Sequence, residues 1–264
     1  MRLCSIASGS SGNCIFVGSD EANILIDVGI SKKRIEEGLS DIGVAPDDID
    51  AIFITHEHSD HIQGLGTWLR KYPCKVFSTV ETLNAILHVN SLGRFDRDLL
   101  CDILPGDEIE IADMKVKAFS IPHDAANPVS YSVVSDDKKI CVATDIGIFT
   151  PSIEKELLSC NAMLLEANHD VHMLEAGPYP YVLKRRILGD NGHLSNENSG
   201  KLLAKVWNEG LSNVFLGHLS KENNYPDLAY ETVKEELLAV HPNCLEVTKL
   251  SVAFRDRPSE LVIV

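Results

Sequence analysis

Hydrophobic residues fall in short runs along the chain, and most of these runs end at glycine, serine, asparagine or aspartate. Short apolar or alternating runs bounded by such residues are typical of β-strands. The pair Asp136-Asp137 predicts a hairpin turn between two of them. We expect strands at residues 2–6, 14–17, 23–27, 50–55, 75–78, 108–111, 115–121, 130–134, 139–143, 162–166 and 213–216.

Helical spacing of apolar residues appears between and after these strands. Ser31 is a candidate N-cap for a helix that runs to about residue 41. Further helices are expected at residues 61–71, 81–88, 179–188, 195–209 and 226–239, and segment 90–105 is the best candidate for a local elaboration. Mixed strands with helices outside indicate layered α/β packing around one core. With no repeat and no proline-rich linker, we expect a single domain over residues 1–264.

Charge and apolar-run length narrow the classes of function. The net charge of −15 argues against general electrostatic binding of nucleic acid. The run Lys184-Arg185-Arg186 leaves room for a local contact with a strand, although a solvated helix face is the simpler interpretation. No apolar run reaches the length of a membrane span, and the N-terminus does not match a signal peptide. Seven cysteines without CxxC spacing indicate buried thiols in a reducing compartment, so we expect a cytoplasmic protein without membrane contact.

The hexapeptide His56-Glu57-His58-Ser59-Asp60-His61 carries the clearest chemistry. It follows an apolar strand and precedes an expected helix. In a loop leaving a strand, His56 and His58 can point the same way and bind one metal, while Asp60 and His61 turn towards a second position. Imidazole nitrogen and carboxylate oxygen suit zinc, manganese and iron. A histidine-rich surface loop is the alternative, and the placement after an apolar strand disfavours it.

Three more polar residues follow the ends of expected strands. His123 comes after strand 115–121, Asp145 after strand 139–143 and His218 after strand 213–216. Because α/β proteins place their sites at the carboxyl ends of strands, we predict that these side chains join the hexapeptide at one edge.

The motif His56-x-His58-x-Asp60-His61, with one histidine, one aspartate and a last histidine downstream, resembles the metallo-β-lactamase superfamily. Segment 7–14 (Ala-Ser-Gly-Ser-Ser-Gly-Asn-Cys) and strand 23–29 also match the usual start of that family. The resemblance implies an α/β fold, an αββα four-layer sandwich with a dinuclear metal site at the sheet edge. It places one metal on His56, His58 and His123, the second on Asp60, His61 and His218, and Asp145 as a bridge between them.

The resemblance also bears on the reaction. Segments 7–14 and 192–196 resemble the YycJ/WalJ branch, whose members are 5′-to-3′ exonucleases acting on DNA. His193 before a helix and Glu166 at the end of a strand look similar to a catalytic pair of ribonuclease Z. We predict that His193, held by Glu166, protonates the leaving oxygen, and that Asp60 helps to orient the nucleophile. A helix-start histidine with local hydrogen bonds is the alternative for His193. His169 and His172 are interpreted as surface histidines.

Substrate contacts are less strongly indicated. Ser10, in the Gly/Ser turn, and Ser195 and Asn196, at a helix start, could bind phosphate. Lys184, Arg185 and Arg186 could contact a longer strand. A tight turn between strands is the alternative for the Gly/Ser segment.

The expected function is a metal-dependent phosphodiesterase, a 5′-to-3′ exonuclease on DNA that uses a metal-bridging hydroxide for in-line attack on phosphorus. The expected cofactors are two divalent ions, Zn²⁺ or Mn²⁺, with iron also possible. A thioester or lactone hydrolase of the same fold is the alternative. A binding scaffold without catalysis is the third possibility, and the complete set of ligand residues disfavours it.

Overall fold

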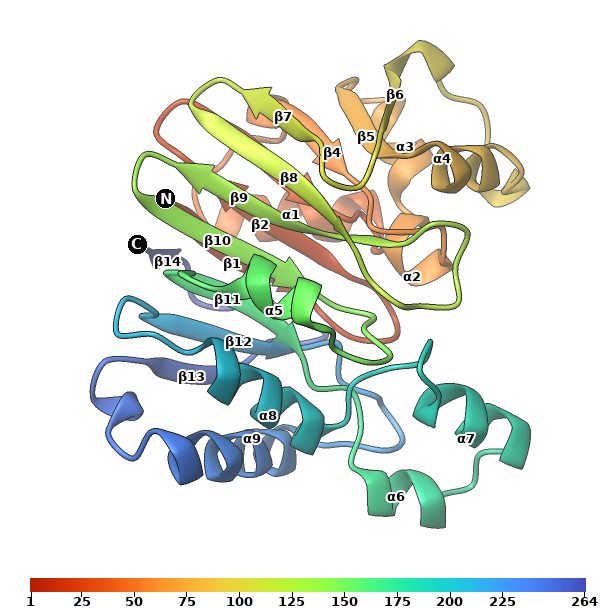
Figure 1. The fold of residues 1–264 in the computed structure, drawn as a ribbon. Helices are drawn as coiled ribbons and strands as arrows, with labels where there is room; N and C mark the ends of the chain where they lie inside the picture. The colour runs from red at the N-terminus through yellow and green to blue at the C-terminus, as the bar shows by residue number, and fades with distance from the viewer.

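Two seven-stranded sheets form the centre of the molecule in the computed structural model, which describes residues 1–264 (Figure 1). The first sheet contains, in spatial order, β14 (Val262–Ile263), β1 (Arg2–Ala7), β2 (Cys14–Gly18), β3 (Asn23–Ile26), β4 (Ala51–Phe53), β5 (Lys75–Thr79) and β6 (Leu100–Ile103). The second contains β13 (Lys249–Val252), β12 (Asn213–Gly217), β11 (Ala162–Glu166), β10 (Lys138–Ala143), β9 (Val129–Ser135), β8 (Met114–Ser120) and β7 (Glu108–Ile111).

Helices cover the outer faces of both sheets. They are α1 (Lys32–Asp41), α2 (Ser59–Ile62), α3 (Leu65–Leu69), α4 (Val80–Leu87), α5 (Pro151–Leu157), α6 (Val171–Ala176), α7 (Tyr181–Leu188), α8 (Asn196–Val206) and α9 (Pro226–Val240). Figure 1 shows α8 and α9 beneath the second sheet, with α6 and α7 standing off to one side. None of the helices combines the length and the apolar character that crossing a membrane requires.

Three clusters of buried apolar residues fill the space between the layers. One cluster joins the two sheets and includes Phe53 and Tyr131, whose rings pack edge to face. A second, around Trp68, lies between the first sheet and its helices. The third, around Leu203, lies between the second sheet and α5, α8 and α9. This arrangement confirms the αββα sandwich, while the single domain over residues 1–264 stays a prediction.

Each sheet changes from antiparallel to parallel pairing along its width. β3 to β6 run parallel in the first sheet, and β10 to β13 run parallel in the second. Ligand-forming residues follow the carboxyl ends of several of these strands, where open sheets place their sites.

Most expected elements are present, with boundaries shifted by one to a few residues, and Ser31 caps α1 through its side chain. The expected helix 61–71 is wrong, because α2 and α3 are separate helices divided near Gly64. A Cβ atom at Gly64 would lie 2.1 Å from the carbonyl oxygen of Ile30, so the backbone passes too close to its neighbour for any side chain. The sequence pattern also missed β6, β13, β14, α5 and α6, which are short and have little periodicity.

Candidate metal centre

The loop between β4 and α2 brings the hexapeptide to the edge of the first sheet. His56 is buried at its start, His58 is the N-cap of α2, and His61 is buried inside that helix. Asp60 is partly exposed, with 22% of its side chain accessible. The imidazoles therefore come from the loop before α2 and from α2 itself, within one short stretch of chain, as the sequence predicted.

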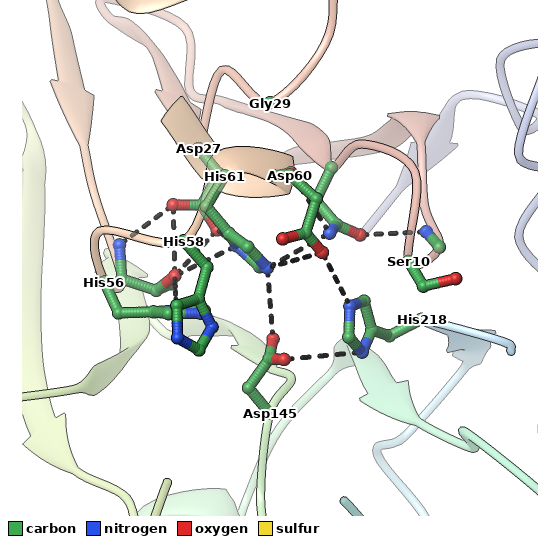
Figure 2. Close-up of polar contacts among 12 residues, drawn as sticks. Ser10, Asp27, Gly29, His56, His58, Asp60, His61, Asp145 and His218 are labelled. Carbon is green, nitrogen blue, oxygen red and sulfur yellow. Dashed lines mark hydrogen bonds and ion pairs between the residues drawn. The ribbon is translucent and has the colours of Figure 1, made fainter. Parts of the chain in front are cut away.

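Four overlapping groups of ligand-forming residues lie at this edge, and two of them contain the residues predicted for the two metals. The three-histidine group contains His56, His58 and His123. The Asp–His–His group contains Asp60, His61 and His218. Within each group the nearest ligand atoms lie within 4.8 Å of one another. Figure 2 shows the Asp145 carboxylate between His61 and His218, and its oxygens also lie 3.4 Å from His61 Nε2 and 3.7 Å from His123 Nε2.

Most of the imidazole rings are anchored through one nitrogen and present the other to the centre. His61 Nδ1 contacts Asp27 Oδ2 at 2.7 Å, and His218 Nδ1 contacts Glu166 Oε1 at 3.0 Å. His56 Nδ1 lies 3.0 Å from Thr55 Oγ1. If each anchored Nδ1 donates its proton outward, each Nε2 keeps a free lone pair facing inward. Metal-binding histidines are oriented in this way.

His123 and His58 complete the three-histidine group. The carbonyl oxygen of Gly192 anchors His123 Nδ1 at 3.0 Å, and His58 alone presents its Nδ1 to the centre. That nitrogen lies 2.9 Å from His56 Nε2 and 3.3 Å from His123 Nε2. Two nitrogens on one tetrahedral zinc stand about 3.3 Å apart. The spacing fits a shared cation.

The buried carboxylate of Asp145 gives a second test of whether the residues of the centre fit divalent cations. Asp145 Oδ2 is buried and has no hydrogen-bond donor. In the three-histidine group the inward nitrogens of His56, His58 and His123 face one another, so the lone pairs of neutral rings meet without enough protons between them. Buried polar atoms without partners are rare in folded proteins. Together with the mixed nitrogen and oxygen donors, these unpaired atoms fit the binding of divalent cations. The identity of the ions remains a proposal.

The two groups differ in electrostatics. Burial, together with the nearby charge of His61, lowers the pKa of His56 well below its usual value, and burial also lowers the pKa of His123. Burial would lower the pKa of His61 and His218 as well, but neighbouring carboxylates outweigh it. Asp27 and Asp145 raise the pKa of His61 well above its usual value, and Asp145 and Asp60 raise that of His218 to about 10.

Three residues of the centre adopt a left-handed backbone at strand ends. Their φ angles are 61° at Asp27, 60° at Asp145 and 56° at His218. Non-glycine residues seldom adopt this conformation, and it costs of order 1–3 kcal/mol at each position. Here it turns each side chain sharply off its strand towards the centre.

His193 and Glu166 form a pair beside the two groups. His193 Nδ1 lies 2.8 Å from Glu166 Oε1, while Glu166 Oε2 accepts hydrogen bonds from the backbone N–H groups of Ile146 and Leu194. Burial would raise the pKa of Glu166, but the charges of His193 and His218 hold it below the usual range. The His193 side chain is 18% accessible, and its Nε2 has no partner within the protein. The predicted pair is therefore brought together with one nitrogen free.

The predicted substrate residues are placed very differently from one another. Ser10 is exposed and lies on the His218 side of the centre (Figure 2). Ser195 and Asn196 are buried: Ser195 Oγ caps the N–H of Asn198, and the Asn196 amide bonds to Asn224. A substrate contact through these two side chains does not fit this arrangement, because both are enclosed. The N–H of Asn196 also donates to the carbonyl oxygen of His169, so an anion contact of the other backbone N–H groups at the start of α8 stays a prediction.

The basic run lies on α7, which has no buried residue. Arg186 forms an ion pair with Asp124, the neighbour of His123, and Lys184 donates to the carbonyl oxygen of Glu175. Arg185 lies 6.0 Å from the ring of Tyr181. The run therefore stays accessible beside the centre.

Several residues that position the centre were not predicted. Asp27 anchors both His61 and Thr55, and Asn13 Nδ2 lies 3.2 Å from His61 Nε2. Asp27 ends an expected strand, as the other ligands do, and that signal was available. His169 was expected at the surface and is buried, because its backbone pairs with Ser195, whereas His172 is exposed as expected.

Known proteins resemble this chain in sequence and in fold. The sequence profile described as "Metallo-beta-lactamase superfamily" matches residues 7–218. The chain is 38% identical over 232 residues to "Exodeoxyribonuclease YycJ" of Bacillus anthracis, which covers 88% of this chain and 87% of that protein. It is equally similar to "Exodeoxyribonuclease WalJ" of Streptococcus pneumoniae, over 88% of this chain and 86% of the relative. Zn²⁺-bound PqqB from Methylobacterium extorquens shares the fold, with a TM-score of 0.70, 15% identity and coverage of 98% and 100% of the two chains.

Proposed function

Since the chain belongs to the metallo-β-lactamase superfamily of hydrolases, we propose that it is a nuclease that degrades DNA from the 5′ end. The observation that carries this proposal is the 38% identity to two exodeoxyribonucleases across 88% of the chain. Nearly the whole of each relative is covered, so the similarity includes the ligand loop, the strand ends and the His193 segment.

The proposed ligands are the three-histidine group for one cation, the Asp–His–His group for a second, and Asp145 between them. When bound, divalent ions would lower the pKa of a water molecule and stabilise the charge that develops on phosphorus. Zn²⁺, Mn²⁺ and iron all suit these donors. The chain's own carboxylates and imidazoles fix where the phosphate group and the attacking oxygen can sit.

Proton transfer to the leaving oxygen is assigned to His193. Its Nδ1 is held by Glu166, which leaves its Nε2 without a partner in a ring that is 18% accessible. A general acid needs this combination of a fixed ring and a free N–H. Asp60, partly exposed between His61 and His218, is proposed to orient the nucleophile.

Arg185, which is exposed, and Lys184, which is partly buried, are proposed to contact the backbone of a longer DNA strand. They would act locally within a chain whose net charge is −15. The seven cysteines are all free, which fits a proposed site of action in the cytoplasm.

The test starts with metal analysis of the purified protein and an activity screen with added Zn²⁺, Mn²⁺ or Fe²⁺. Single- and double-stranded 5′-phosphorylated DNA, labelled at either end, is compared with S-lactoylglutathione. Immediate release of a labelled mononucleotide from 5′-labelled DNA supports 5′-to-3′ digestion, whereas a ladder of labelled products contradicts it. Exclusive cleavage of the thioester would overturn the proposal in favour of the alternative hydrolase.

Replacing His193 by Ala tests the proton-transfer assignment. We expect turnover of DNA to fall about 100- to 10,000-fold, the usual contribution of a general acid, with the metal content unchanged. His172→Ala, an exposed histidine outside both ligand groups, is the matched control. Full activity of His193→Ala would assign that ring to local structure only.

A further inference from the structure

Arg255 forms no ion pair with any carboxylate of the chain, although the charge of its neighbour Asp256 acts on it and opposes the lowering of its pKa by burial. Its side chain is partly buried, in a protein with a net charge of −15. The guanidinium donates instead to the carbonyl oxygen of Leu219 at 2.6 Å and to the hydroxyl of Ser11 at 3.2 Å. Ser10 Oγ lies at 3.4 Å. A partly desolvated arginine bonded only to neutral groups retains its charge and spare N–H donors for an anion.

The backbone brings this guanidinium close to the metal centre. Leu219 directly follows His218, and the N–H of His218 donates to Ser8 Oγ at 2.8 Å. The N–H of Ser8 in turn donates to the carbonyl oxygen of Phe254, next to Arg255. Arg255 is therefore linked to His218 by two short routes, through the carbonyl oxygen of Leu219 and through Ser8, on the side where Figure 2 places Ser10.

The Gly/Ser turn is shaped to receive the guanidinium. A Cβ atom at Gly9 would lie 3.0 Å from Arg255 Cζ, so the absence of a side chain allows the guanidinium to lie against the turn. Gly9 also has a φ of 150°, which L-residues rarely adopt. The N–H of Gly9 donates to Asn13 Oδ1, and Asn13 contacts His61. The turn is thus held from both sides, by the metal centre and by Arg255.

A cavity of about 250 Å³ opens beside Arg255. Its lining includes Ser8, Lys221, Tyr225 and Asp256, and the last three are exposed. The volume lies below the roughly 300–1,000 Å³ of pockets for drug-sized ligands, which suits a phosphate group with part of its sugar. Lys221 adds a second positive charge, and the Tyr225 ring offers a surface on which a base can stack. Burial lowers the pKa of Arg255, in accord with a guanidinium drawn partly out of water.

We infer that Arg255, with the hydroxyls of Ser10 and Ser11, forms a phosphate subsite beside the Asp–His–His group. The subsite binds a phosphate of the DNA strand next to the one that is cleaved, so it deepens the proposed nuclease function and rests on it. Arg255 binds the phosphate through two parallel N–H donors, a geometry that lysine lacks. The bound phosphate is either the terminal 5′ monoester or an internal diester.

The first experiment measures binding without turnover. Calorimetric titration of the metal-loaded protein with thymidine 5′-monophosphate compares wild type, Arg255→Gln, Arg255→Lys and Arg257→Gln. Arg257 is the matched control, an exposed arginine that packs on Phe254 and does not touch the turn. We expect affinity to fall about 10- to 100-fold in Arg255→Gln and less in Arg255→Lys, as for loss of charge-assisted hydrogen bonds. Arg257→Gln should bind as wild type does.

Thermal unfolding and metal content are measured on the same samples. A folded, metal-loaded Arg255→Gln protein that binds the nucleotide as tightly as wild type overturns the subsite. If that variant unfolds, Arg255→Lys decides: undiminished binding overturns the subsite, and weaker binding by a folded protein supports it. Because binding needs no cleavage, loss of affinity in Arg255→Gln supports the subsite even where DNA is not hydrolysed.

A second experiment identifies the phosphate. KM and kcat are compared on oligonucleotides that carry a 5′ phosphate or a 5′ hydroxyl. A rise in KM in Arg255→Gln for the 5′-phosphorylated strand alone assigns the subsite to the terminal monoester. An equal rise for both strands assigns it to an internal phosphate. Active wild type together with an unchanged KM for both strands in Arg255→Gln contradicts the subsite and leaves the nuclease function standing.

Discussion

The three-histidine group and the Asp–His–His group lie side by side, yet they are supported by different chemistry. Neutral oxygens of Thr55 and Gly192 anchor the first group, and the pKa values of His56 and His123 are lowered. Carboxylates of Asp27 and Glu166 anchor the second, and the pKa values of His61 and His218 are raised. The first group therefore offers neutral imidazoles, whereas the second offers more negative charge and competes with protons for its cation.

The largest effect is expected at Asp145, which contacts residues of both groups. Replacing it by Asn keeps the shape and removes the shared charge, so both cations should bind more weakly. We expect DNA cleavage to fall by about 100- to 1,000-fold, as for loss of one preorganised interaction at a reacting centre. Turnover and metal content per chain are the measurements. Loss of only one metal would show that Asp145 belongs to one group and does not serve both cations.

Asp27→Asn should separate the two groups. It removes a carboxylate that anchors His61 and reaches the three-histidine group only through the hydroxyl of Thr55, which donates to Asp27 and lies against His56 Nδ1. We expect metal affinity at the Asp–His–His group to fall about 10- to 100-fold, the usual effect of losing such a support, with the other group little changed. Stepwise metal titration measures this. Asp113→Asn is the control, since Asp113 bonds Ser19 and Ser135 away from the centre; an equal effect in the control would indicate a general loss of stability.

The number of protons released when a cation binds should also differ between the two groups. We expect this effect to be smaller than those of Asp145→Asn and Asp27→Asn. His218, with its pKa raised to about 10, carries a proton at pH 7 that a cation must displace. Affinity at the Asp–His–His group should therefore fall as the pH is lowered below about 10, by up to about tenfold per pH unit for each proton released. His56, with its lowered pKa, has no proton to release at pH 7. Calorimetric titration of the metal-free protein with the cation, in buffers of different ionisation enthalpy, counts the protons. Equal proton release at both metal-binding steps would contradict the proposed difference between the two groups.

The parts of the site that lie close in sequence, or directly after a strand, could be predicted. The hexapeptide is one continuous stretch from the end of β4 into α2, and His123, Asp145 and His218 each follow an apolar strand whose pattern marks where it ends. Asp27 also ends a strand, but its role depends on His61, which is distant in sequence. A pattern along the chain does not reveal that pairing.

Burial was the property that sequence reasoning judged least well. Asn196 was expected to contact substrate, but its amide bonds to Asn224 across 28 positions of the chain. Arg255 went unnoticed because it follows a short strand, β13, and its neighbours Gly9, Ser11 and Leu219 come from two other segments. The sandwich was predicted correctly from the resemblance to the metallo-β-lactamase superfamily. The periodicity of the longer strands and helices indicated only layered α/β packing, and the two- to four-residue strands at the sheet edges carry too little periodicity to be recognised.

The left-handed backbone at Asp27, Asp145 and His218 places conformational strain at three points of the centre. Glycine would adopt this geometry without the steric penalty that a Cβ imposes. Selecting variants of this chain for thermal stability alone should therefore favour glycine at these positions, and each such change would remove part of the centre. Directed evolution of a more heat-resistant form would have to hold these three codons fixed and gain stability elsewhere.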